Sequence, residues 1–199
     1  MRIALAGNPN SGKTTMYNAL TGRNEKVGNW AGVTVEKKEH QIKKGYYKGK
    51  EDIIIVDLPG AYSMSPFTSE ESVTSKYVKE QSPDVIINIV DATNLSRSLF
   101  FTTQLLELGI PVVVALNKSD LNDKKHNEID AVKLSDQLLC PVVETVSTSK
   151  KGLKKLALSL SASFNEERCV KEVKDSCTKF TRKNTARTPL IEPHVLIID

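Results

Sequence analysis

A glycine-rich turn near the start of the chain constrains the fold more than any other feature. The run Gly7-Asn-Pro-Asn-Ser-Gly-Lys13-Thr14 matches the pattern GxxxxGK[ST], and it follows the short apolar segment 3–6. Such a loop turns its backbone N–H groups inward at a helix N-terminus and forms a nest for anions. The sequence therefore predicts a strand–loop–helix unit that binds phosphate. Lys13 would supply a charge for the β- and γ-phosphates, and Thr14 a hydroxyl for Mg²⁺.

The composition is that of an ordinary soluble domain. The chain has 199 residues, of which 39% are hydrophobic and 26% charged, and a formal net charge of +4. It contains no apolar run of about 18 residues, the length that a membrane-spanning helix needs. Three cysteines without a CxxC pair indicate reduced thiols rather than a disulfide framework or a zinc site. The three histidines are scattered, and no iron site is recognisable.

Apolar β-rich runs alternate with helical patterns along the chain, which indicates an α/β fold with a mostly parallel sheet. We expect six strands flanked by about five helices, with a nucleotide-binding domain over 1–164 and a partly ordered or disordered appendage over 165–199. The expected strands cover 3–6, 34–44, 53–56, 85–90, 112–116 and 142–145, and the expected helices cover 13–20, 68–80, 95–108, 129–139 and 151–164.

Two further segments fit the phosphate end of a nucleotide. Asp57-Leu-Pro-Gly60 follows a buried strand, so that Asp57 could hold Mg²⁺ through water and the N–H of Gly60 could approach the γ-phosphate. Thr34 is the candidate that would ligate Mg²⁺ only while the γ-phosphate is present. Glu70 and Glu71 lie near this second segment, and we interpret them as helix N-terminal residues, with Glu71 completing a capping box with Thr68.

Two loops near the end of the sheet fit the base. Asn117-Lys-Ser-Asp120 follows an apolar strand, and a carboxylate at position 120 could accept hydrogen bonds from guanine N1–H and N2–H₂, which adenine cannot donate. The Lys118 stem could lie along the base, and Asn117 could tie this loop to the phosphate loop. Ser147-Thr-Ser149 follows the next strand, where a backbone N–H could meet guanine O6.

The chain resembles the Ras-like P-loop GTPases and, more narrowly, the N-terminal G domain of ferrous iron transport protein B. The resemblance covers residues 1–164 and is carried by five runs: 7–15, 27–36 (VGNWAGVTVE, the most specific), 57–63, 90–95 and 105–111. It implies GTP hydrolysis, possible oligomerisation, and a transmembrane iron-permease domain that this chain lacks. The soluble chain would then act at the cytoplasmic face of the cell membrane, regulating Fe²⁺ uptake.

The motifs and the resemblance together predict the site residues. The nucleotide-binding set is Gly7, Asn8, Pro9, Asn10, Ser11, Gly12, Lys13, Thr14, Thr15, Gly32, Val33, Thr34, Asp57, Gly60, Asn117, Lys118, Asp120, Ser147, Thr148 and Ser149. The candidates for catalysis are Lys13, Thr34, Gly60 and Asn10, and those for Mg²⁺ are Thr14, Thr34 and Asp57.

The resemblance also implies a K⁺ ion, held by Asn10 and by the backbone carbonyls of Gly28 and Trp30. The residue after the DxxG segment is Ala61 rather than glutamine, so the usual water-positioning side chain is missing. We therefore expect slow intrinsic hydrolysis that is faster in K⁺ than in Na⁺.

Two other functions compete with this interpretation. An Era-like, RNA- or ribosome-associated GTPase has a similar phosphate loop, and residues 178–187 carry four basic side chains and no acidic one. The GNW segment argues against that class, and we expect no nucleic-acid partner. The other alternative is a regulatory module that binds nucleotide without meaningful turnover.

Overall fold

The computed structural model describes residues 1–22, 26–30, 36–47, 52–123, 129–160 and 162–163. Its strands are β1 (Arg2–Gly7), β2 (Lys26–Asn29), β3 (Glu36–Gln41), β4 (Ile54–Asp57), β5 (Val85–Asp91), β6 (Val112–Asn117) and β7 (Val142–Thr145). Its helices are α1 (Lys13–Thr21), α2 (Ser69–Gln81), the 3₁₀ turn η1 (Ala92–Asn94), α3 (Leu95–Leu106), α4 (Ser119–Asp123) and α5 (Ala131–Leu138). Residues 153–160 are also helical.

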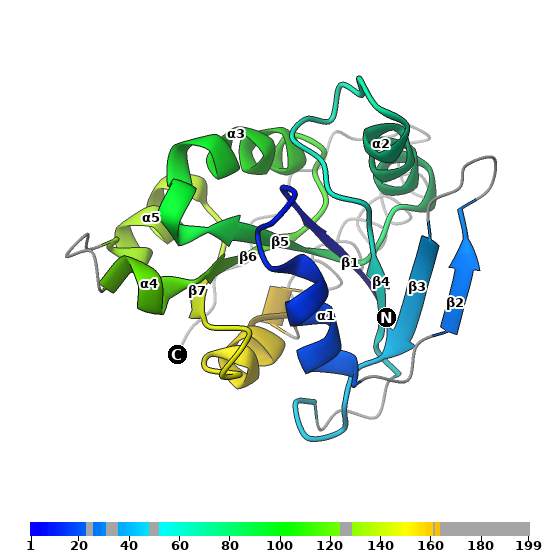
Figure 1. The fold of residues 1–199 in the computed structure, drawn as a ribbon. Helices are drawn as coiled ribbons and strands as arrows, with labels where there is room; N and C mark the ends of the chain where they lie inside the picture. The colour runs from blue at the N-terminus through cyan, green and yellow to red at the C-terminus, as the bar shows by residue number, and fades with distance from the viewer. Residues whose placement is uncertain (23–25, 31–35, 48–51, 124–128, 161, 164–199) are drawn as a thin grey trace, which may run out of the picture.

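The strands form one sheet in the order β2-β3-β4-β1-β5-β6-β7 (Figure 1). The pairs β1–β4, β1–β5, β5–β6 and β6–β7 are parallel, whereas β2–β3 and β3–β4 are antiparallel. The predicted P-loop GTPase architecture, a mostly parallel sheet flanked by helices, is therefore confirmed. In such a sheet the parallel strands end at one edge, which brings the loops after β1, β4, β5, β6 and β7 together.

Successive side chains of a strand point to opposite faces of the sheet, and this produces two hydrophobic cores, one on each face. In β1, Ile3 and Leu5 point to the face covered by α1 and the helical residues 153–160. Ala4 and Ala6 point to the opposite face, which α2 and α3 cover (Figure 1). All four side chains are fully buried. A strand buried on both faces reads as a continuous apolar run, which is why these strands were recognisable from sequence.

The structure contains three elements that the sequence did not indicate, namely β2, α4 and the 3₁₀ turn η1. Strand β2 adds a seventh strand at the antiparallel edge, where its four residues KVGN are too few and too polar to give a strand pattern. Helix α4 has only five residues directly after β6. The predicted helix start at Thr68 is confirmed, because its hydroxyl oxygen accepts a hydrogen bond from the N–H of Glu71 at 3.2 Å.

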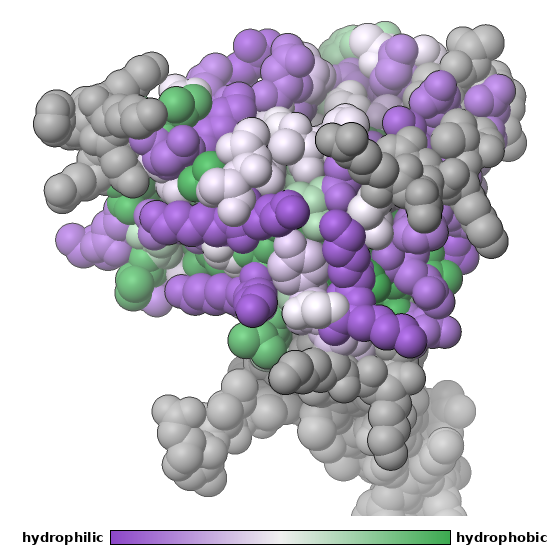
Figure 2. Space-filling model, turned by 60° about the horizontal axis from the view of Figure 1, so that its bottom comes forward, coloured by the Kyte–Doolittle hydropathy of each residue, from purple (hydrophilic) through white to green (hydrophobic). Residues whose placement is uncertain are grey.

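The surface shown in Figure 2 is mostly hydrophilic over the described residues, with hydrophobic side chains scattered among them. Within the part of the chain that the structure describes, no helix combines the length and the hydropathy needed to cross a bilayer. The appendage predicted for residues 165–199 lies outside the described residues, as do Gly32, Val33 and Thr34.

Candidate functional site

The loop between β1 and α1 borders a cavity of about 490 Å³. Two other segments reach the same cavity through Gly60, which follows β4, and Glu70, in the first turn of α2. The lining residues are Asn8, Pro9, Asn10, Gly12, Lys13, Thr14, Thr15, Gly60 and Glu70. Helix α1 begins at this cavity, so that its free N–H groups and the positive end of its dipole favour an anion there.

Gly12 gives the loop its shape. It precedes α1 with φ 94°, a left-handed conformation that side chains rarely adopt, and no side chain caps the helix. A Cβ at this position would collide with Nδ2 of Asn117, the last residue of β6. The position therefore requires glycine for both its backbone conformation and its close approach to Asn117.

The side chains of Lys13 and Asp57 meet across this region. Lys13 Nζ lies 2.7 Å from Asp57 Oδ1, and the two side chains are only 13% and 9% exposed. The pair joins the start of α1 to the end of β4. The motif-bearing residues that the sequence placed 44 positions apart thus converge at one point.

The segment after β4 is fixed against the phosphate loop by backbone contacts. The N–H of Ala61 donates to the Gly7 carbonyl at 3.2 Å, and a Cβ on Gly60 would lie 3.0 Å from Pro9. On the other side, the Thr74 hydroxyl of α2 donates to the Pro59 carbonyl at 2.8 Å. Gly60 is therefore held at the cavity by both the phosphate loop and α2.

Glu71 is a structural residue, and its carboxylate has partners beyond those of the predicted capping box with Thr68. Its carboxylate accepts hydrogen bonds from the N–H groups of Tyr62 and Phe67, each at 3.0 Å. The N–H groups of Phe67 and Tyr62 hold the pKa of this carboxyl below its ordinary value, although burial opposes them. One buried charge thus pins both ends of the turn between Gly60 and α2.

Glu70 reaches the cavity, which the sequence analysis did not anticipate. Its own N–H and the Ser69 hydroxyl lower the pKa of its exposed carboxyl. A general base works best with a pKa raised toward the operating pH, so this environment does not favour a proton-accepting role. The signal available in the sequence was its position one residue before the buried Glu71, on the opposite side of the helix start.

Asn117 links the base-side loops to the phosphate loop. Its Nδ2 donates to the Ser11 carbonyl at 2.9 Å, and its Oδ1 accepts from the Ser147 hydroxyl at 2.7 Å and the Ser147 N–H at 3.1 Å. A single buried amide therefore connects the loops after β1, β6 and β7. This is the contact to the phosphate loop that the sequence suggested for Asn117.

Lys118 makes a second connection. Its ammonium donates to the Asn10 carbonyl at 2.8 Å and lies 2.6 Å from Oδ2 of Asp91, the last residue of β5. Asp91 was missed as a candidate, although its position at the carboxyl end of a parallel strand is the signal that could have identified it.

The other base-side candidates lie next to these contacts. Asp120 is the second residue of α4 and is partly exposed, and Thr148 and Ser149 are exposed. A bridge between Val146 and Lys151 closes the turn that carries residues 147–149. The structure therefore places Asp120 and this turn at the ends of the neighbouring strands β6 and β7.

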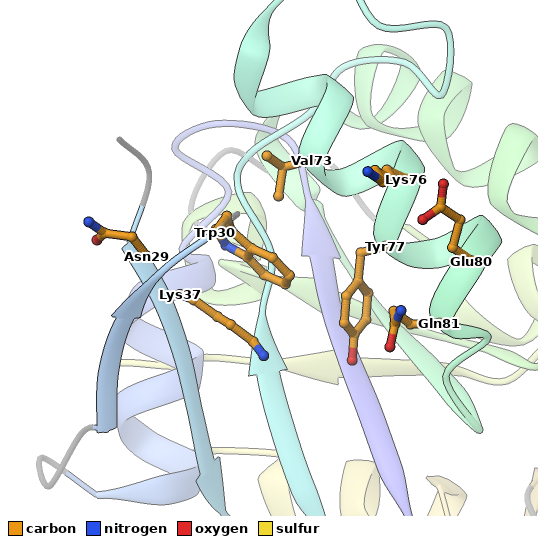
Figure 3. Close-up of a pocket in the computed structure, with 8 residues that line it drawn as sticks. All are labelled: Asn29, Trp30, Lys37, Val73, Lys76, Tyr77, Glu80 and Gln81. Atoms are coloured by element: carbon orange, nitrogen blue, oxygen red, sulfur yellow. The ribbon is translucent and has the colours of Figure 1, made fainter. Parts of the chain in front are cut away.

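Trp30 contributes to a different cavity, of about 470 Å³, between the β2–β3 hairpin and α2 (Figure 3). Its ring meets that of Tyr77 edge-on at 5.3 Å, and Lys37 Nζ lies 5.3 Å from its centroid. The Trp30 side chain thus packs between α2 and the β2–β3 hairpin. Gly28 lies in β2, on the same hairpin.

Comparison with known proteins gives a consistent result. The family model described as Ferrous iron transport protein B matches residues 1–160. The chain is 48% identical over 164 residues to the Fe(2+) transporter FeoB of Salmonella typhimurium and 46% identical to that of Escherichia coli K12. Each alignment covers 80% of this chain but 21% of the relative. The chain therefore spans about a fifth of the length of these transporters.

Solved structures of the same kind share the fold. A GDP-bound variant of S. thermophilus NFeoB is 47% identical with a TM-score of 0.76, covering 82% of this chain and 61% of that one. The FeoB G domain of Methanococcus jannaschii is 41% identical with a TM-score of 0.72, covering 82% of this chain and 97% of that one. These matches do not favour the alternative of an Era-like GTPase.

Proposed function

Because the chain belongs to the ferrous iron transport protein B family, we propose that it binds guanine nucleotides and hydrolyses GTP to GDP and phosphate. The observation that carries this proposal is the convergence of the phosphate loop and Gly60 on the cavity at the start of α1, with Asn117 bonded to the phosphate loop from the end of β6. The phosphate loop, Gly60 and the buried Asn117 are held together by direct contacts. A GDP-bound relative of 47% identity supports the choice of ligand.

The phosphate end of the nucleotide would occupy the 490 Å³ cavity. There the N–H groups at the start of α1 and the ammonium of Lys13 would bind the β- and γ-phosphates. The N–H of Gly60 would approach the γ-phosphate, with its position fixed by the Ala61–Gly7 hydrogen bond. These donors would stabilise the charge that develops during hydrolysis, because they are already oriented before the reaction.

The residues present fit a Mg²⁺ ion. The hydroxyl of Thr14 lines the cavity, and the carboxylate of Asp57 lies 2.7 Å from Lys13, at the same point of the site. Hydroxyl and carboxylate oxygens are ligands that Mg²⁺ prefers. Together with Thr34, these residues would hold the ion, which neutralises phosphate charge when bound.

The base would lie beyond Asn117, against the loops after β6 and β7. Asp120 would accept hydrogen bonds from guanine N1–H and N2–H₂, and a backbone N–H of residues 147–149 would donate to O6. The Lys118 stem would lie along the base plane. Adenine lacks the donor pair that Asp120 requires, so the proposed preference is for GTP over ATP.

We also propose that K⁺ accelerates hydrolysis, with Asn10 and the carbonyls of Gly28 and Trp30 as its ligands. Asn10 lines the phosphate cavity, and Ala61 supplies no side chain that could orient water. A monovalent cation beside the phosphates would then offset the developing negative charge.

The role of the whole protein is inferred from its relatives, which are Fe²⁺ transporters of about four times this length. We propose that the domain regulates Fe²⁺ uptake through a transmembrane domain, from the cytoplasmic face of the cell membrane. The step that it controls would follow the state of the bound nucleotide, because the γ-phosphate contacts of Thr34 and Gly60 are lost on hydrolysis.

Calorimetry with GDP and a non-hydrolysable GTP analogue, in Mg²⁺, tests the binding proposal. We expect saturable heats with both ligands, and a loss of at least about 100-fold in affinity in Lys13→Ala, because the phosphates lose a charged partner. Lys154→Ala, an exposed lysine of the 153–160 segment, is the matched control. The absence of binding heat in the unmodified protein would refute the proposed function.

Phosphate release at equal concentrations of KCl and NaCl tests turnover and the K⁺ proposal together. We expect a faster rate in K⁺, and no difference between the salts in Asn10→Ala. Asn10 has φ 65°, so Asn10→Gly serves as a second variant that removes the side chain without straining the backbone. Equal rates in both salts for the unmodified protein would exclude K⁺ activation, and binding without phosphate release would favour the regulatory module.

A further inference from the structure

Asp91 lies at the junction of the base-side and phosphate-side loops. It ends β5, and its two carboxylate oxygens have different partners. Oδ2 lies 2.6 Å from the ammonium of Lys118, whereas Oδ1 accepts hydrogen bonds from the N–H and the hydroxyl of Thr93 at 2.9 and 2.7 Å. The carboxylate is thus fixed on one side by Thr93 of η1 and faces Lys118 with the other.

Lys118 also contacts the phosphate loop. The same ammonium donates to the Asn10 carbonyl at 2.8 Å. Both residues have left-handed backbones, with φ 62° for Lys118 and 65° for Asn10. Such conformations are sparsely populated for residues with side chains and persist where surrounding contacts hold them. The ammonium therefore supports the shape of two loops at once.

We propose that Asp91 is a positioning residue of the nucleotide site, which acts by holding the Lys118 ammonium between the base loop and the Asn10 carbonyl. This inference rests on the proposed function of the site. Without the carboxylate, the flexible lysine stem can turn its ammonium into water, and the Asn10 carbonyl loses its donor. The two loops that enclose the nucleotide then separate more readily, and bound GDP leaves faster.

The environment of the pair supports a specific interaction. The side chains of Asp91 and Lys118 are 16% and 30% exposed, so water screens their attraction less than it would on an open surface. Burial raises the pKa of the Asp91 carboxyl, but the hydrogen bonds from Lys118 and Thr93 outweigh it and hold that pKa below its ordinary value. The carboxylate is consequently charged at neutral pH.

A double-mutant cycle on the release of a fluorescent GDP derivative, in Mg²⁺, tests the inference. Asp91→Asn keeps the size of the side chain but removes its charge, and we expect release about tenfold faster, equivalent to one charge-assisted hydrogen bond. In the Lys118→Met background the same substitution should have no further effect. Asp91→Glu, which restores the charge, should recover part of the slow release.

Thr93→Val is the control for the alternative role of Asp91 as a cap of η1. It removes the hydroxyl bonded to Oδ1 and leaves the Lys118 contact in place, so we expect release within about twofold of the unmodified protein. Thermal unfolding without nucleotide checks that all variants fold.

An equal acceleration by Asp91→Asn in the presence and absence of the Lys118 ammonium would overturn the inference, as would an unchanged rate in Asp91→Asn itself. Either result leaves the proposed function standing, because GDP still binds. A protein that fails to bind GDP at all would refute the proposed function, and this inference with it.

Discussion

The phosphate side of the site holds its shape through backbone, whereas the base side holds its shape through side chains. Around the cavity, Gly12, Gly60 and the Ala61–Gly7 hydrogen bond define the surface. At the ends of β5, β6 and β7, the defining groups are Asn117, Lys118 and their partners. Apart from the charge of Lys13, phosphate is bound by closely spaced N–H donors, which many sequences supply if the chain bends correctly. A base must be distinguished from other bases, which requires particular donors and acceptors.

Substitutions that alter the bend of the phosphate loop should therefore weaken the binding of every nucleotide. Substitutions of base-side side chains should change which nucleotide binds. The largest effect is expected for Gly12→Ala. The added Cβ imposes a strained backbone at φ 94° and collides with Asn117, so GDP affinity should fall by at least about 100-fold. Titration calorimetry measures this change. Gly45→Ala, where a Cβ meets nothing within 4 Å, is the matched control. A tolerated Gly12→Ala would show that the bend is not the recognition element.

Asp120→Asn should distinguish the base side from the phosphate side most clearly, because it should change which nucleotide binds. The new amide donates where the carboxylate accepted, so GTP should bind about 100-fold more weakly and XTP more tightly. Competition against a fluorescent nucleotide gives both affinities. Asp136→Asn, on the exposed side of α5, should change neither. Affinities for GTP and XTP that fall together would place Asp120 outside base recognition.

Glu71→Gln tests a buried charge that fixes the segment between Gly60 and α2 on the phosphate side. A carboxylate accepts from both Tyr62 and Phe67, whereas an amide turns an N–H toward one of them, which should cost about 2 kcal/mol of unfolding free energy at neutral pH. Denaturant titration measures the loss. Glu70→Gln should change stability by less than about 0.5 kcal/mol, because the Glu70 side chain is exposed.

The pH dependence of the Glu71 contribution has a defined sign. The pKa of Glu71 is lowered on folding from the ordinary value of 4.5, so its stabilisation is present above pH 4.5 and is lost as the pH falls through the lower pKa of the folded state. The difference in stability between the unmodified protein and Glu71→Gln should therefore shrink on acidification. A constant difference between pH 7 and acid would contradict this assignment.

The elements that could be predicted are those in which composition alone decides the structure. β1, β5 and β6 are largely buried on both faces and are mostly apolar, and the glycine-rich loop must bend where Gly7 and Gly12 stand. Strand β2 could not be predicted, because a four-residue edge strand is stabilised by pairing with β3 rather than by its own pattern.

The candidate site divides in the same way. The contact from Asn117 to the phosphate loop followed from the motifs, since both loops leave the same edge of the sheet. Glu70, Asp91 and the actual partners of Glu71 did not, because each depends on how a side chain crosses between segments distant in sequence. The sequence around a carboxylate does not indicate which backbone groups it will bind in the folded chain.

The amide of Asn117 couples the two ends of the nucleotide site, which bears on nucleotide exchange. It is bonded to the loops that would contact the two ends of the ligand. A movement of one loop therefore disturbs the hydrogen bond that holds the other. A shift of the end of β6, where the base would be recognised, would therefore reach the phosphate loop through that one side chain.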